Sequence, residues 1–166
     1  EIACLTRTLS YHIGHPVPEQ AFVSAILCDA GMVILNSLLQ EEYAGIVASA
    51  GGDESLAASE QTHVGFSHIE VGLRLMRKWQ FPPDLIETVG KHHEPAPGGQ
   101  VHREAGLVYA ARRTLDHLAA GADMSAVLAV LPPELMAAFR LDAASLAQSW
   151  EKSCREIEAA RQMLSI

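Results

Sequence analysis

Residues 60–94 decide the fold class of this chain and read EQTHVGFSHIEVGLRLMRKWQFPPDLIETVGKHHE. Apolar residues recur in this stretch at intervals of three and four, as Val71, Leu75 and Trp79 do, which is the spacing of one helix face. Pro82-Pro83 interrupts the pattern, and a proline suits the first position of a helix because its missing N–H would find no partner there. The stretch predicts two helices joined by a short proline turn.

The same signals extend through the rest of the chain. Clusters of Gly and Pro punctuate the helical spacing, and Pro132-Pro133 repeats the helix start at Pro82-Pro83. The best strand candidate, residues 31–39, continues a helical pattern equally well. We therefore predict an all-α fold of about seven helices with short loops, built as one domain over residues 1–166. The start at Glu1 rather than Met leaves a truncated N-terminus open.

The last predicted helix covers residues 143–164. Leu146, Trp150 and Ser153 follow a four-three spacing, but the polar Ser153 interrupts the apolar seam that a sustained coiled coil requires. Packing on its own domain is the first interpretation. Contact with a partner, or with a second copy in a homodimer, is the alternative.

Composition excludes several classes of protein. Apolar residues make up 49% of the chain and charged residues 19%, which argues against disorder. A net charge of −8 disfavours a nucleic-acid partner, because such domains carry clustered Lys and Arg. We find no uninterrupted apolar run of the roughly 18 residues that span a bilayer, so no membrane contact is expected. The three cysteines have no CxxC spacing, which fits a reducing cytoplasm.

Candidate metal ligands occur at three places. Asp29 lies in a nearly all-apolar run, where a carboxylate is costly unless it is paired, bound to a cation or bracing a neighbouring loop. His68 lies beside a predicted buried stripe formed with Gly72, Leu75 and Trp79, and the glycine indicates close approach of another helix. His92-His93 ends a helix, where imidazoles suit either capping or metal binding. Imidazole and carboxylate together are usual ligands of Zn, Mn and Fe.

In order and spacing, these residues resemble the HDOD domain, an output-domain branch of the HD phosphohydrolase superfamily. The likeness extends through residues 107–111 into the final helices and rests on four pieces: ILCDAGMVIL at 26–35, Glu60 with His68-Ile69-Glu70-Val71-Gly72, Trp79-Gln80-Phe81-Pro82, and Lys91-His92-His93-Glu94-Pro95. The resemblance implies a multi-helix bundle around a metal site, which hydrolyses phosphate esters in catalytic relatives. It makes Asp29, His68, His92 and His93 the residual or vestigial metal ligands.

The chain departs from the family pattern at two of the usual ligands. Cys28 stands where a His precedes the Asp of the family name, and residues 110–113 read AARR where a late Asp is expected. Either arginine could therefore place a guanidinium beside Asp29 in place of a metal cation, unless both are ordinary surface charges. The residues expected to line the site are Cys28, Glu60, Arg112 and Arg113.

The first functional prediction is a regulatory module of a bacterial signalling protein in the cytoplasm. It would lack phosphohydrolase activity and act on a protein partner or on neighbouring domains, with the cofactor open between none and a divalent metal. One alternative is a phosphohydrolase that holds Mn, Fe or Zn at Asp29, His68 and one of the paired histidines. A second alternative is a plain α-helical interaction domain whose histidines only satisfy core hydrogen bonds.

Overall fold

The fold is entirely helical over the described part of the chain. A computed structural model describes residues 1–164, apart from the side chains of residues 53, 54 and 164, and contains eleven α-helices and one short 3-10 helix. No strand occurs within residues 1–164, so the all-α prediction is confirmed. The helix starts predicted at Pro83 and Pro133 are also confirmed, since each proline occupies the first helical position.

The chain divides into two compact units, where the sequence predicted one domain. The terminal unit consists of Glu1–Ala25 and Glu94–Ile166, and the central unit is Ile26–His93. Each unit buries an apolar cluster of its own, and a single domain over residues 1–166 stays a prediction. Periodicity along a sequence reports which helix faces are apolar, but not which faces share a core.

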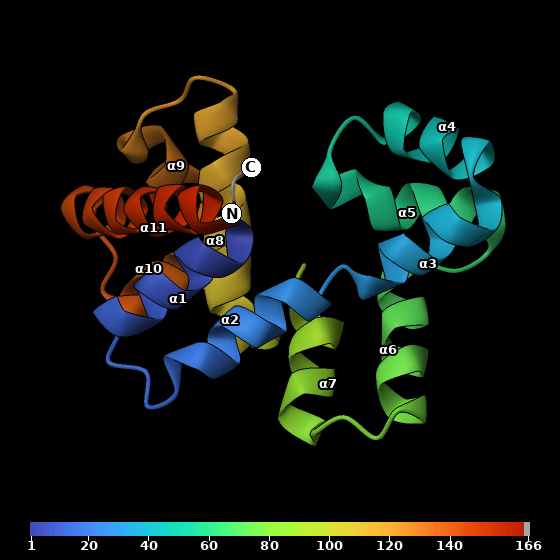
Figure 1. Cartoon of the computed structure of the whole chain (residues 1–166), viewed down its shortest axis with the longest axis horizontal. Coiled ribbons are helices and arrows are strands. Elements are labelled where there is room, and N and C mark those ends of the chain that lie inside the picture. Colours follow the sequence, from blue (N-terminus) through green and yellow to red (C-terminus); the bar gives the residue numbers. More distant parts are fainter. Residues whose placement is uncertain (165–166) are drawn as a thin grey trace. The chain divides into compact units, whose positions relative to one another are not determined.

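The terminal unit packs its first helix against its last (Figure 1). Leu5, Leu107 and Leu146 are fully buried in its core. The Thr8 hydroxyl donates to the Ser149 carbonyl at 2.9 Å and joins the two helices inside the core. The helices are α1 (Ile2–His12), the first part of α2 (Pro18–Leu27), the 3-10 helix (Pro97–Gly99), α8 (Arg103–Ala119), α9 (Met124–Val130), α10 (Pro133–Phe139) and α11 (Ala143–Leu164).

Helix α11 matches the range predicted for the last helix. Leu146 and Ser153 are both fully buried, so this part of the helix packs on its own unit as the first interpretation proposed. The Ser153 hydroxyl is satisfied by the Trp150 carbonyl at 2.8 Å, which explains how a polar residue fits the seam. Met163 near the end is 87% exposed.

The central unit contains five helices after the end of α2 (Figure 1). Leu35, Tyr43, Ile46 and Leu56 form its buried cluster. Helix α3 packs on α6, α4 on α5, and α6 on α7. These helices are α3 (Ala30–Leu39), α4 (Glu41–Ala50), α5 (Asp53–Val64), α6 (His68–Lys78) and α7 (Pro83–Lys91).

Helix α6 begins at a capping box and presents one buried stripe. The Ser67 hydroxyl accepts from the Glu70 amide, and the Glu70 carboxylate accepts from the Ser67 amide at 2.8 Å. The buried positions are His68, Gly72 and Met76. The predicted continuation of this stripe through Leu75 and Trp79 is wrong, because Met76 faces the core and Trp79 is 61% exposed.

Close packing of α3 on α6 confirms the expectation drawn from Gly72. A Cβ atom added at Gly31 would lie 1.9 Å from the His68 carbonyl oxygen, a distance that no real Cβ shows. A Cβ added at Gly72 would lie 3.3 Å from Val89 Cγ1. Only glycine at position 31 therefore lets the backbone of α3 reach the first turn of α6.

The segment Pro18–Leu39 is long and apolar enough to cross a membrane by length and composition, contrary to the sequence expectation. It folds as two helices, α2 and α3, separated by a turn at Cys28 and Asp29. Each has ten residues, or about 15 Å of helix, which is half the roughly 30 Å of a bilayer core. Core helices of water-soluble proteins meet the same length and composition test.

Candidate metal centre

The first residue of α6, His68, is held by a buried carboxylate. His68 and Glu60 are both fully buried. One oxygen, Glu60 Oε2, lies 2.7 Å from the backbone nitrogen of His68 and 2.7 Å from its Nδ1. Because the α6 N-terminus carries unpaired N–H groups and the positive end of the helix dipole, it favours a carboxylate here. The contact leaves His68 Nε2 as the ring nitrogen facing away from Glu60.

His92, at the C-terminal end of α7, is oriented in the same way. Its Nδ1 lies 2.7 Å from the Val89 carbonyl oxygen, which can only accept, so Nδ1 carries the proton. In the neutral ring, Nε2 is then the unprotonated nitrogen. This atom is buried and has no hydrogen-bond partner among the residues that the structure describes.

His93 completes a cluster of three imidazoles. Each of His68, His92 and His93 offers a ring nitrogen, and these three atoms lie within 4.8 Å of one another. The Nε2 atoms of His68 and His93 are 3.1 Å apart. This separation suits a hydrogen bond in which one of the two nitrogens carries a proton, and equally a cation shared by the two rings. The cluster thus has the donor set and spacing of a cation site.

Asp29 lies beside this cluster. Its Oδ1 is 3.6 Å from His92 Nε2, and its side chain is 28% exposed. Asp29 is the residue before α3, but its side chain makes no capping hydrogen bond there. The carboxylate approaches the His92 ring, although it is less buried than the apolar sequence around it predicted.

The remaining predicted lining residues fall in three different places. Cys28 is fully buried, but it does not belong to the close group of ligand atoms found over the described residues. Glu60 contacts the ring nitrogen of His68 that faces away from the other imidazoles. Arg112 and Arg113 are in α8 of the terminal unit, so their pairing with Asp29 of the central unit stays a prediction.

One buried contact behind His68 was missed in the sequence. Tyr43 on α4 is 2% exposed, and its hydroxyl donates to Glu60 Oε1 at 2.5 Å. A tyrosine among apolar residues is indistinguishable from an ordinary core residue in a periodicity pattern. The available signal was chemical, because a buried tyrosine hydroxyl requires a hydrogen-bond partner.

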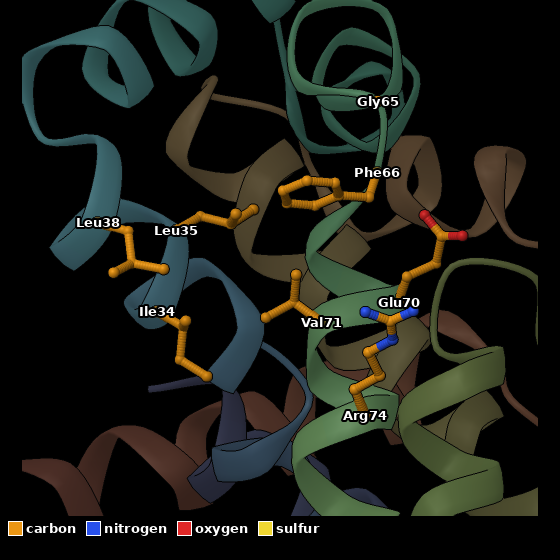
Figure 2. A pocket seen from close by; sticks show the side chains of 8 residues that line it. All are labelled: Ile34, Leu35, Leu38, Gly65, Phe66, Glu70, Val71 and Arg74. Atoms are coloured by element: carbon orange, nitrogen blue, oxygen red, sulfur yellow. The ribbon is translucent and has the colours of Figure 1, made fainter.

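A groove lies farther along the same two helices, α3 and α6. Figure 2 shows Leu35 and Phe66 pointing toward each other across it, with Val71 beneath them. The cavity has a volume of about 480 Å³, and Glu70 and Arg74 belong to its lining. The Glu70 carboxylate is engaged in the capping box of α6. Most of the other lining residues are apolar, and none of the three histidines lines the groove.

The helical arrangement defines the chain as an α-helical bundle of the HD type. The model of the HDOD domain matches residues 1–95, which is more than half of the chain, and the chain therefore belongs to the HDOD domain family. This confirms the resemblance drawn from the sequence motifs.

A solved structure has the same fold. It is a crystal structure from Shewanella amazonensis SB2B of a protein described as a candidate phosphohydrolase, with a TM-score of 0.70 and 21% identity. The match covers 91% of this chain and 56% of that one, so this chain spans about half the length of its structural neighbour. At such identity the likeness shows the fold alone. Comparison with curated proteins gives no match.

Proposed function

We propose that this chain is a regulatory HDOD module whose central unit holds one divalent metal ion at His68, His92 and His93, with Asp29 beside them. The module acts on a protein partner or on neighbouring domains of a bacterial cytoplasmic signalling protein. The main observation in support of the metal site is that His68 and His92 are oriented in the same way. Each has its Nδ1 engaged by the protein, and each presents Nε2 to a common space.

This orientation is the usual one for metal-binding histidines. Such residues almost always donate the other ring N–H to a carboxylate, a backbone carbonyl or a water. Glu60 is the carboxylate for His68, and the Val89 carbonyl is the acceptor for His92. Three imidazoles and a nearby carboxylate suit Zn, Mn or Fe. A bound ion would supply Lewis-acid chemistry, polarising a phosphoryl oxygen or lowering the pKa of a bound water.

The donor set does not favour a two-metal hydrolase. Two-metal hydrolases hold their ions about 3.5–4 Å apart, and that arrangement requires more donors than three histidines and one carboxylate. Cys28 replaces one family ligand and lies outside the close group of ligand atoms. Exposed apolar residues on α3 support contact with a protein: Val33 is 67% exposed and Leu38 is 74% exposed.

Metal analysis tests the proposal directly. The protein is purified without chelator and without added metal, and its Zn, Mn and Fe contents are measured alongside those of His68→Ala. We expect close to one metal ion per wild-type chain, or its uptake on titration, and none in the variant. Equal metal content in the two proteins would contradict the site.

A metal-dependent phosphohydrolase is the second candidate. It is favoured by the Nε2 atom of His92, which is buried with no hydrogen-bond partner among the described residues and could serve a catalytic ion. The metal-loaded protein is assayed with a phosphodiester and with cyclic dinucleotides, and His68→Ala is the control. Regulation predicts equal, background turnover in both proteins, whereas metal-dependent turnover lost in the variant would establish the hydrolase.

A further inference from the structure

We infer that Tyr43 and Glu60 form a buried pair that sets the tautomer and ring orientation of His68, and that the pair thereby controls metal affinity from outside the ligand set. The inference rests on the proposed metal centre and extends it to two positioning residues. Neither residue belongs to the close group of ligand atoms. Each acts through His68 rather than on the metal.

Short contacts connect Tyr43, Glu60 and His68 in a line across three helices. Tyr43 on α4 donates its hydroxyl hydrogen to Glu60 Oε1 at 2.5 Å. Glu60 on α5 contacts the backbone nitrogen and the Nδ1 atom of His68 through Oε2, at 2.7 Å each. Tyr43 is 2% exposed, and Glu60 and His68 are 0% exposed. Water therefore cannot replace either contact.

The contacts of Glu60 assign the proton on His68. A backbone N–H and a tyrosine O–H are donors to the Glu60 carboxyl group, and an ionised carboxylate offers only acceptors. The third partner, His68 Nδ1, must then donate as well. Because neutral imidazole carries one ring proton, Nε2 is left with a lone pair directed at His93 Nε2, 3.1 Å away. This is the tautomer that can bind a metal through Nε2.

Tyr43 fixes the rotation of the carboxylate. Its hydroxyl holds Oε1, so Oε2 stays aligned with both His68 donors. Without the hydroxyl, the Glu60 carboxylate could turn in its buried site, and His68 would lose its fixed orientation. Tyr43 also belongs to the apolar cluster with Leu35, Ile46 and Leu56, which holds the ring in place.

Metal affinity of matched variants tests the inference. Glu60→Gln and Tyr43→Phe are titrated with Zn²⁺ and Mn²⁺ by calorimetry, and Co²⁺ absorption reports the ligand environment. Loss of an outer-shell partner typically lowers metal affinity about 10- to 100-fold. We expect that range for Glu60→Gln and a smaller loss of about 3- to 10-fold for Tyr43→Phe, which is one contact farther from the ligand. Changed Co²⁺ bands in both variants are also expected.

The chain supplies its own control pair. The Tyr11 hydroxyl donates to Glu19 Oε1 at 3.3 Å in an exposed contact of the terminal unit. Tyr11→Phe and Glu19→Gln remove the same groups outside the central unit. Both should retain wild-type affinity and Co²⁺ bands. A loss of affinity in these controls equal to the loss in Tyr43→Phe and Glu60→Gln would overturn the inference.

The His68 tautomer gives a readout that does not depend on any variant folding. Long-range ¹H–¹⁵N spectra of the metal-free wild-type protein should show Nδ1 protonated and Nε2 unprotonated for His68. The opposite tautomer would overturn the inference. The two proposals also fail in different ways: a wild-type protein that binds no metal contradicts the proposed function, whereas wild-type affinity in Glu60→Gln and Tyr43→Phe contradicts only the positioning pair.

Discussion

Each compact unit buries a histidine against a glutamate, and the two pairs differ in what the second ring nitrogen does. In the terminal unit, His15 Nε2 lies 2.9 Å from Glu104 Oε1, and its Nδ1 accepts from the Val17 amide at 3.1 Å. In the central unit, His68 has Glu60 on Nδ1, but Nε2 faces the imidazole of His93. A backbone amide closes the second nitrogen of His15, whereas the second nitrogen of His68 meets another imidazole that is itself a candidate metal ligand.

The comparison shows what separates a structural histidine from a candidate ligand. Burial and a carboxylate partner are common to both, so neither feature is diagnostic. The difference is the partner of the second ring nitrogen, which is a backbone N–H for His15 and another imidazole for His68. His92 lies in the same cluster of imidazoles as His68, and its buried Nε2 has no hydrogen-bond partner over the described residues.

The largest effect is expected from breaking the helix contact that supports His68. Gly31→Ala would place a Cβ 1.9 Å from the His68 carbonyl oxygen, and backbone must move to relieve the overlap. We expect the free energy of unfolding to fall by more than about 3 kcal/mol, with amide exchange accelerating most in α3 and α6. Denaturant titration and hydrogen exchange measure both effects.

Substitutions at two further glycines serve as comparisons for the expected loss in the free energy of unfolding of Gly31→Ala. A Cβ at Gly106 in the terminal unit would lie 2.9 Å from the Phe139 ring, a side chain that can shift, so Gly106→Ala should cost less. A Cβ at Gly45 in α4 meets nothing within 4 Å, and Gly45→Ala should stabilise the helix by up to about 1 kcal/mol. An equal loss in all three variants would contradict the packing account.

Substituting His68 and His15 in turn should affect metal affinity differently. His68→Ala deletes a proposed ligand, so affinity should fall by more than the roughly 100-fold typical of an outer-shell change. His15→Ala deletes a histidine whose two nitrogens are already satisfied, and metal affinity should stay at the wild-type value. Calorimetric titration with Zn²⁺ and Mn²⁺ checks both. A comparable loss in His15→Ala would remove the distinction between the pairs.

His15→Ala should instead reduce stability. The substitution leaves Glu104 and the Val17 amide without their partner in a part-buried site. A loss of about 2 kcal/mol in the free energy of unfolding is expected. Thermal or denaturant unfolding measures this loss, and an unchanged unfolding midpoint would show that the terminal pair does not stabilise the fold.

The smallest effect concerns the pH dependence of the terminal pair. Burial is the largest single influence and opposes ionisation of Glu104, but the hydrogen bonds to His15 and to a backbone amide, with the nearby His15 and His102 rings, together outweigh it and hold the pKa of Glu104 below its ordinary value of 4.5. A lowered pKa means that the folded state favours the carboxylate, so this stabilisation is present above pH 4.5 and is lost as the pH falls through the folded-state pKa. Glu104→Gln should therefore destabilise the protein at neutral pH and have progressively less effect below pH 4.5. Unfolding curves of both proteins from pH 7 to 3 measure the difference, which should not be constant.

Much of the fold was predictable from local signals, and its division into units was not. Proline starts at Pro83 and Pro133 were correctly identified because a proline acts within its own turn. The break between α3 and α4 at Gln40 was missed because no Gly or Pro marks it, although the residue has a φ of 46°. About seven helices were therefore expected, and eleven α-helices are found over residues 1–164.

Part of the candidate site could likewise be predicted from the sequence, and part of it could not. Asp29, His68, His92 and His93 were named from residue chemistry and family resemblance, and the three histidines do lie together. The role of Glu60 behind His68 and the participation of Tyr43 depend on contacts between α4, α5 and α6. Residue spacing within one helix carries no information on such contacts.

Anomalous diffraction from crystals grown with Zn²⁺ or Mn²⁺ tests the central claim most directly. We expect one strong anomalous peak in the central unit, within about 2.0–2.2 Å of the Nε2 atoms of His68 and His92. The His93 ring should be the third ligand. A peak at His15 and Glu104, with none at the three histidines, would contradict it.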